Sequence, residues 1–161
     1  MFNGAFTDLL LAALAAILVF AAVVDVRTFT ISNRLNLTVA LLAPVYWASV
    51  ELSPWPGIAV QLAAAATVFV LLAGAFYAGM MGGGDVKLAA ALALWFTPAG
   101  TVKFLVLMSL AGGVLTLGLV AWHRAKRREG RPQVPYGVAI AVGGLAILAP
   151  ILTQRFLNQF A

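Results

Sequence analysis

Asp25 and Asp85 stand out among the five acidic residues of this 161-residue chain because each lies at the edge of a long apolar segment. Asp25 follows the apolar run 9–24, and Asp85 precedes the apolar segment 86–96. A charged group at membrane depth costs about 2.5 to 3.5 kcal/mol on insertion scales, so an acid in this setting is a functional candidate. The three remaining acids lie near expected helix ends or in a loop, where a charge costs little; they are Asp8, Glu51 and Glu129.

Two carboxylates that come together can carry out acid–base hydrolysis. Two such groups at close range cannot both ionise easily, so the pair holds a single proton near neutral pH. The ionised carboxylate can take a proton from water while the protonated one donates to a carbonyl oxygen, and the roles then exchange. Peptide hydrolysis needs this state and requires no metal, cofactor or covalent nucleophile. The chain also has no cysteine, which excludes thiol nucleophiles, disulfides and cysteine-ligated metals.

The elements that position these acids must be membrane helices. Hydrophobic residues make up 63% of the chain and charged residues only 9%, whereas a soluble domain carries about 25% charged residues. The apolar runs are rich in alanine and leucine and do not alternate, which favours helices over a barrel. At roughly 20 residues per span, we predict an all-α polytopic membrane protein with about six transmembrane helices. Residues 1–161 then form a single membrane-embedded domain.

Six apolar segments are the expected helices, and one of them is short. Pro54, Pro56 and Gly57 predict a tight turn between the second and third segments. The fourth is short for a full span, so we expect it to begin at Asp85 or slightly before, with a glycine loop at the membrane edge. The six segments are 9–24, 37–52, 58–78, 86–96, 102–122 and 136–152.

Basic residues indicate which side of the membrane is cytoplasmic. If successive loops alternate sides, only Lys103 and Arg155 fall on one side, and all other basic residues fall on the opposite side. By the positive-inside rule the richer side is cytoplasmic, and the formal charge of +5 is then explained without nucleic acid. The basic residues assigned to the cytoplasmic side are Arg27, Arg34, Lys87, Arg124, Lys126, Arg127, Arg128 and Arg131.

The same topology places the remaining features. Both termini are expected outside, and Asp25 and Asp85 fall at the cytoplasmic end of their helices, so their carboxylates can meet. Trp55 and Trp95 are expected at the outer interface and Trp122 at the inner one, as in an aromatic belt. The lipid bilayer is therefore the first expected partner of the chain.

A glycine triplet, Gly82 to Gly84, directly precedes Asp85. Glycine lacks a Cβ, so its backbone can approach another chain closely and adopt positive φ. A helical substrate hides its scissile amide and must be held extended beside the carboxylates, which makes the triplet a candidate substrate-binding segment. A flexible turn explains the triplet equally well. A phosphate-binding loop is disfavoured because the Gly-Lys-Ser/Thr ending is absent.

Two segments resemble the motifs of the type IV prepilin peptidases, which are Gly-x-Gly-Asp intramembrane aspartyl peptidases. The segment 25–33, Asp-Val-Arg-Thr-Phe-Thr-Ile-Ser-Asn, is similar to Asp-x-Arg/Lys-x-x-x-Ile-Pro-Asn, with Ser32 where proline is usual. The segment 82–88, Gly-Gly-Gly-Asp-Val-Lys-Leu, fits Gly-x-Gly-Asp-x-Lys, and the segment 134–141, Val-Pro-Tyr-Gly-Val-Ala-Ile-Ala, is also similar. The chain most resembles the short form found with tight-adherence (Flp) and Caulobacter-type pilus systems.

The resemblance implies a function and a site. Asp25 and Asp85 would be the catalytic aspartates, and Gly82 and Gly84 the motif glycines. The enzyme would remove a short leader from prepilins and pseudopilins at the cytoplasmic face of the bacterial inner membrane, just after a glycine that precedes a hydrophobic helix. Larger members carry an insertion with paired cysteines and also methylate the new terminus. This chain has neither insertion nor cysteine, so methylation is not expected.

Two other classes of protein fit the same acids. A small proton- or cation-coupled transporter could use Asp25 and Asp85 as a relay or an ion site, although a charge near mid-bilayer would then be expected. A noncatalytic scaffold for pilus assembly is the third interpretation. Exchange of either aspartate for asparagine distinguishes these, because only the peptidase would lose cleavage of a prepilin.

Overall fold

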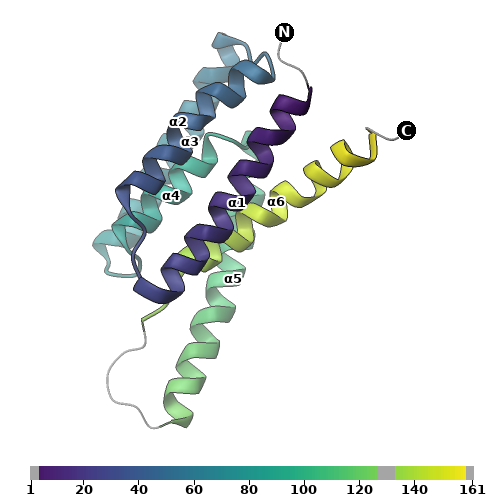
Figure 1. Cartoon of the computed structure of the whole chain (residues 1–161). Helices are drawn as coiled ribbons and strands as arrows, with labels where there is room; N and C mark the ends of the chain where they lie inside the picture. The colour runs from purple at the N-terminus through teal and green to yellow at the C-terminus, as the bar shows by residue number, and fades with distance from the viewer. Residues whose placement is uncertain (1–3, 127–132, 159–161) are drawn as a thin grey trace.

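The computed structural model describes residues 4–126 and 133–158, and this part of the chain is helical, with no β-strand. The predicted all-α class is therefore confirmed. Six α-helices and one short helical turn follow each other in the order shown in Figure 1: α1 (Gly4–Thr28), α2 (Asn33–Ser49), η1 (Pro54–Ile58), α3 (Ala59–Tyr77), α4 (Gly83–Ala93), α5 (Pro98–Ala125) and α6 (Tyr136–Asn158).

Successive helices run in alternating directions through the bundle (Figure 1). Both ends of the chain therefore lie at one end of the bundle, which we call the terminal end. The ends of α1 and α3 and the starts of α4 and α6 lie at the other, the aspartate end, where α5 extends beyond its neighbours. α1 and α5 both pack against α6, while α2 and α3 both pack against α4.

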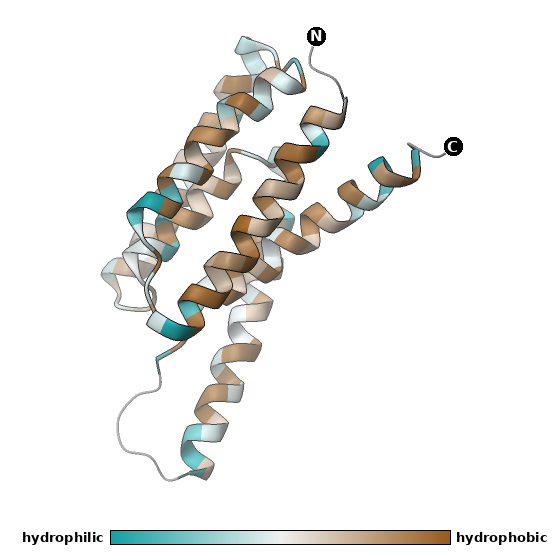
Figure 2. Cartoon of the chain, viewed as in Figure 1, coloured by the Kyte–Doolittle hydropathy of each residue, from teal (hydrophilic) through white to brown (hydrophobic). Residues whose placement is uncertain are grey.

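Four helical segments are long and apolar enough to cross a membrane: α1, Pro54–Tyr77, α5 and α6. Large apolar side chains are exposed along them, as expected for surfaces that face lipid tails. Hydrophobic residues cover the lengths of the helices in Figure 2, and hydrophilic ones gather mostly near helix ends. The chain is thus a multi-pass membrane protein. α2, with 17 residues, and α4, with 11, are shorter than these spans.

α4 forms the centre of the group that carries Asp85. Eight of its eleven residues are buried, among them Leu88, Ala89 and Leu92. Alanine at several of these positions lets α2 and α3 approach the α4 backbone closely. The short length of the fourth helix therefore has a packing reason. A helix surrounded by protein does not need the length of a lipid-exposed span.

Polar caps set several helix boundaries that hydropathy alone misplaced. Ser32 Oγ accepts a hydrogen bond from Leu35 N at 3.3 Å, so α2 begins at Asn33 and not at 37. Thr97 Oγ1 accepts one from Gly100 N at 3.2 Å, and Pro98 opens α5 four residues earlier than expected. Ser53 Oγ caps η1 in the same way, through Gly57 N at 3.3 Å.

The aromatic-belt prediction was wrong for Trp95. Its side chain is buried, donates from Nε1 to Val39 O at 3.0 Å and stacks on Tyr46 with ring centroids 5.1 Å apart. Trp55 and Trp122 are exposed, as an interfacial position requires. The remaining basic-loop assignments, Arg127, Arg128 and Arg131, and the acid Glu129 lie outside the described residues.

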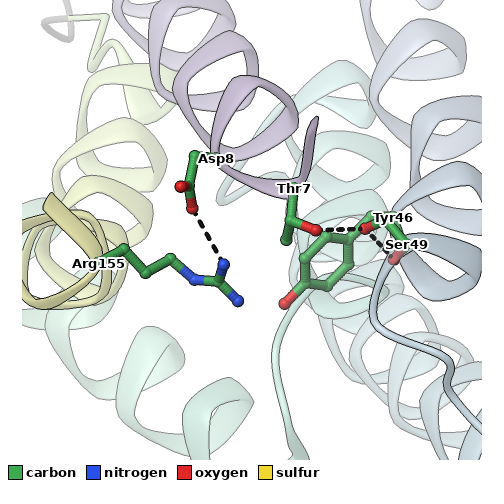
Figure 3. A network of polar contacts seen from close by, with 5 residues as sticks. All are labelled: Thr7, Asp8, Tyr46, Ser49 and Arg155. Carbon is green, nitrogen blue, oxygen red and sulfur yellow. Dashed lines mark hydrogen bonds and ion pairs between the residues drawn. The ribbon is translucent and has the colours of Figure 1, made fainter. Parts of the chain in front are cut away.

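Polar side chains join three helices at the terminal end (Figure 3). Arg155 of α6 forms an ion pair with Asp8 of α1, with Nη1 and Oδ1 3.0 Å apart. Thr7 Oγ1 donates to Ser49 Oγ at 3.2 Å, which links α1 to α2. The sequence did not indicate these contacts, because Asp8 and Arg155 are 147 residues apart.

Candidate active site

Asp25 lies in the last full turn of α1, and its carboxylate faces the first turn of α6. The apolar run predicted a helix end at this residue, but α1 continues to Thr28. Asp25 is only 2% exposed, and its Oδ2 accepts a hydrogen bond from Gly137 N at 2.7 Å. A helix N-terminus favours a negative charge, so α6 provides a backbone anion site for Asp25.

Asp85 lies in the first turn of its own helix. Its Oδ2 accepts a hydrogen bond from Gly82 N at 3.2 Å, which caps the start of α4. The residue is 9% exposed, and its Oδ1 is buried without a hydrogen-bond partner among the described residues. A buried carboxylate oxygen with no donor is uncommon, since most such atoms are bonded to protein or water. This oxygen therefore has an unused capacity to accept a hydrogen bond.

Both acids lie at the aspartate end of the bundle, Asp25 in the last turn of α1 and Asp85 in the first turn of α4. Ile31, in the segment between α1 and α2, lies between the two helix starts. A Cβ on Gly84 would lie 2.5 Å from the Ile31 carbonyl oxygen, and one on Gly137 would lie 2.7 Å from Ile31 Cδ1 and 2.8 Å from Asp25 Cγ. Glycine at both positions therefore allows α4 and α6 to close around Ile31.

Two further hydrogen bonds fasten the segment after Asp25 to the start of α4. Asn36 Nδ2 donates to Gly84 O at 2.9 Å, and the Asn36 side chain is buried. Lys87 Nζ donates to Asn33 Oδ1 at 2.9 Å on the exposed side. The two segments that resemble family motifs are thus bonded to one another, which fixes the position of one aspartate relative to the other.

The glycine triplet is not the loop that the sequence suggested. Gly82 is extended and caps α4, while Gly83 and Gly84 belong to its first turn. The reason is local, because the Asp85 carboxylate bonds back to Gly82 N and starts the helix earlier. A Cβ on Gly83 would lie 3.4 Å from the Phe76 ring, so this residue also faces a neighbour within the chain. A contact between the triplet and a substrate stays a prediction.

A groove of about 400 Å³ runs along α5, and neither Asp25 nor Asp85 lines it. Met81 and Tyr136 line it, and each directly precedes the glycine whose N–H holds one of the carboxylates. The α5 wall consists largely of small residues. One of them is Gly113, where an added Cβ would meet no other atom within 4 Å. The other lining residues are Met108, Ser109, Gly112, Thr116, Leu117 and Ile140.

The sequence interpretation missed three residues of this site, Ile31, Asn36 and Gly137. The segment 134–141 gave a signal for Gly137 through its resemblance to the family, but without a role. Ile31 likewise stood in the motif-like segment 25–33 without a role, and Asn36 gave no signal beyond its proximity to Asp25, because its partner lies on another helix. Within residues 4–126 and 133–158, no three histidine, cysteine or acidic side chains come together as a metal site.

The fold and the site together describe a multi-pass helical membrane protein with two buried acids at one end of its bundle. The sequence matches the type IV leader peptidase family over residues 12–117, which is more than half of the chain and includes Asp25 and Asp85. The chain belongs to this family, and the resemblance noted in its motifs is confirmed at that level. Searches of curated proteins and of solved structures found no match.

Proposed function

We propose that this chain is an intramembrane aspartyl endopeptidase that removes the leader of prepilin-like proteins, with Asp25 and Asp85 as its catalytic residues. The family gives the peptidase class and implies prepilin-like substrates. The observation that carries the proposal is the geometry of the two acids. Both are buried, each accepts a hydrogen bond from a backbone N–H group, and Ile31 lies close to the helix start beside each of them.

The hydrogen bonds suggest a division of roles between the acids. Asp25 accepts a hydrogen bond from the Gly137 N–H at the start of α6, which suits the carboxylate that takes a proton from water. Asp85 has an oxygen without a partner, which suits the group that carries the proton and donates it to the scissile carbonyl. The roles then exchange as the tetrahedral intermediate collapses, and no metal or cofactor takes part.

The groove along α5 provides the proposed path for the substrate. A substrate helix can lie against the small side chains of α5, with its first residues unwound near Met81 and Tyr136. We propose that the extended backbone then passes the glycine triplet at Gly82 and Gly83. Gly84 contributes by its close packing against Ile31, which leaves little room for a substrate there.

The proposed orientation of the bundle in the membrane follows from the distribution of its basic residues. The aspartate end would face the cytoplasm, and both termini would lie outside, in the inner membrane of a bacterium with a tight-adherence (Flp) type of pilus. The bundle agrees with such an arrangement, because its chain ends gather opposite the acids (Figure 1). The basic leader of a prepilin would stay in the cytoplasm. A single domain would provide the whole peptidase site.

The decisive experiment is cleavage of a co-expressed prepilin-like protein, followed by its size on a gel. Asp25→Asn and Asp85→Asn keep the shape of the side chain and remove the acid, so cleavage should fall by about 100-fold or more. Asp8→Asn, at the terminal end, is the matched control and should retain cleavage. Membrane insertion is checked by protein level in the membrane fraction. Normal leader removal by a well-inserted Asp85→Asn variant would exclude the proposal and favour a scaffold or a transporter.

A further inference from the structure

A second groove lies along α4, between α2 and α3. α2 and α3 both pack against α4, and between them runs a groove of about 560 Å³. Its floor is one face of α4, at the helical spacing Lys87, Ala90, Ala91 and Leu94. Its walls come from α2 and α3; they are Asn33, Asn36, Leu37, Ala40, Ala65, Ala66 and Phe69.

The groove is apolar along its length and polar at one end. Alanines line its body on all three helices, so the floor and walls are shallow and hydrophobic. Asn33, Asn36 and Lys87 lie at the aspartate end, in the first turns of α2 and α4. Lys87 is exposed there, and Asn33 takes one of the three N–H donors of its ammonium group. Arg34 is exposed next to Asn33 and adds a second positive charge.

Asn36 provides an independent sign that the polar end has an occupant. Its side chain is only 5% exposed, and its amide nitrogen is used by Gly84 O. Its Oδ1 is buried without a donor among the described residues. Buried side-chain oxygens generally accept a hydrogen bond, so we expect a molecule in the groove to donate one to this atom.

We propose that this groove binds an anionic phospholipid. An acyl chain would lie on the alanine floor, and the phosphate would pair with Lys87. A headgroup hydroxyl, such as that of phosphatidylglycerol, would donate to Asn36 Oδ1. The positive charges at this end would repel the basic leader of a prepilin, so electrostatics favours an anionic lipid over the substrate as occupant.

The site would affect the position of Asp85 without taking part in the reaction. Lys87 and Asp85 share the first turns of α4, and Asn36 holds the Gly84 carbonyl of the same turn. A lipid bonded to Lys87 and Asn36 would therefore fasten the start of α4. Binding can be measured as stability and lipid retention, so the test does not depend on peptidase activity.

The experiment uses the purified full chain in a neutral detergent with added phosphatidylglycerol or phosphatidylcholine. Phosphatidylglycerol should raise the Tm and remain as a one-to-one adduct in native mass spectrometry. Lys87→Gln should weaken retention by roughly tenfold, since one charge-assisted contact is lost. Ala66→Phe should also prevent retention, because it fills an exposed wall of the groove. Lys103→Gln and Ala63→Phe are the matched charge and size controls and should bind as the unchanged chain does.

Four results would overturn the proposal. Equal stabilisation by phosphatidylcholine would show that the charged end is not recognised. Wild-type retention by both Lys87→Gln and Ala66→Phe would place the lipid elsewhere. Equal stabilisation by inorganic phosphate, or displacement of the lipid by a prepilin helix that crosslinks to residue 66, would show a different occupant.

Discussion

The buried and partly buried acids have different kinds of partner at the two ends of the bundle. At the terminal end, Asp8 is paired with Arg155, and a hydroxyl chain from Thr7 to Ser49 adds neutral hydrogen bonds (Figure 3). At the aspartate end, Asp25 and Asp85 are more deeply buried, and the hydrogen bonds described for them come from backbone N–H groups. Neither forms an ion pair within the part of the chain that the structure describes.

The contrast separates an acid paired with a base from two acids bonded to backbone N–H groups. In the pair formed by Asp8 and Arg155, each charge offsets the other. Backbone N–H groups stabilise a carboxylate while leaving it able to gain and lose a proton, because they do not provide a full opposing charge. Helix starts are thus a means of holding two acids close together without neutralising either.

The largest effect that would test this contrast is expected at Gly137. In Gly137→Ala the new Cβ must displace either Ile31 or the Asp25 carboxylate, from which it would lie under 3 Å. Misplacement of a reacting group by about 1 Å can cost about 100-fold in rate, and cleavage of a prepilin reporter should fall by that order. Gly113→Ala, where the Cβ meets open space, is the control. Full activity in Gly137→Ala would mean that the α6 start does not position Asp25.

A smaller effect is expected at Asn36, which bonds the start of α4 to α2. Asn36→Ala removes one buried hydrogen bond, and the free energy of unfolding should fall by about 1 kcal/mol. Thermal unfolding in detergent measures the stability, and reporter cleavage measures the loss of Asp85 positioning. Thr38→Ala, on an exposed face of the same helix, should change neither quantity by as much. Unchanged cleavage in Asn36→Ala would limit the role of this contact to stability.

The smallest effect is expected at the terminal end. Arg155 and Asp8 are partly solvent-exposed, so their pairing should contribute less than about 1 kcal/mol. Asp8→Asn and Arg155→Gln should each lower the Tm slightly, and the exchange Asp8→Arg with Arg155→Asp should recover part of the loss. Cleavage should stay within about twofold of the unchanged chain, equivalent to about 0.4 kcal/mol. A strong loss of activity here would remove the distinction between the two ends.

Much of the fold could be predicted from the sequence, because a long apolar segment is by itself a strong indication of a membrane helix. The six apolar segments correspond to six α-helices in the described residues, and the alternating topology correctly placed Asp25 and Asp85 at one end of the bundle. Hydropathy did not give the boundaries, because Ser32 and Thr97 cap helices by hydrogen bonds that hydropathy does not measure. The Trp95 prediction failed for a related reason, since a tryptophan near a helix end can also face protein.

The site could be predicted only in part. An acid beside an apolar run is visible in the sequence, whereas its hydrogen-bond partners come from distant segments. Gly137 is 112 residues from Asp25, and no local pattern relates the two. The glycine triplet was misread as a loop because a helix cap and a flexible turn have the same composition. Only the reach of the Asp85 side chain back to Gly82 distinguishes them.

Ile31 acts as a spacer in this molecule. Its backbone touches the first turn of α4 and its side-chain tip touches the first turn of α6. The gap between these two helices is therefore set by the volume of one branched residue. A shorter side chain at this position would leave space between the first turns of α4 and α6, and a longer one would press against α6 beside Gly137.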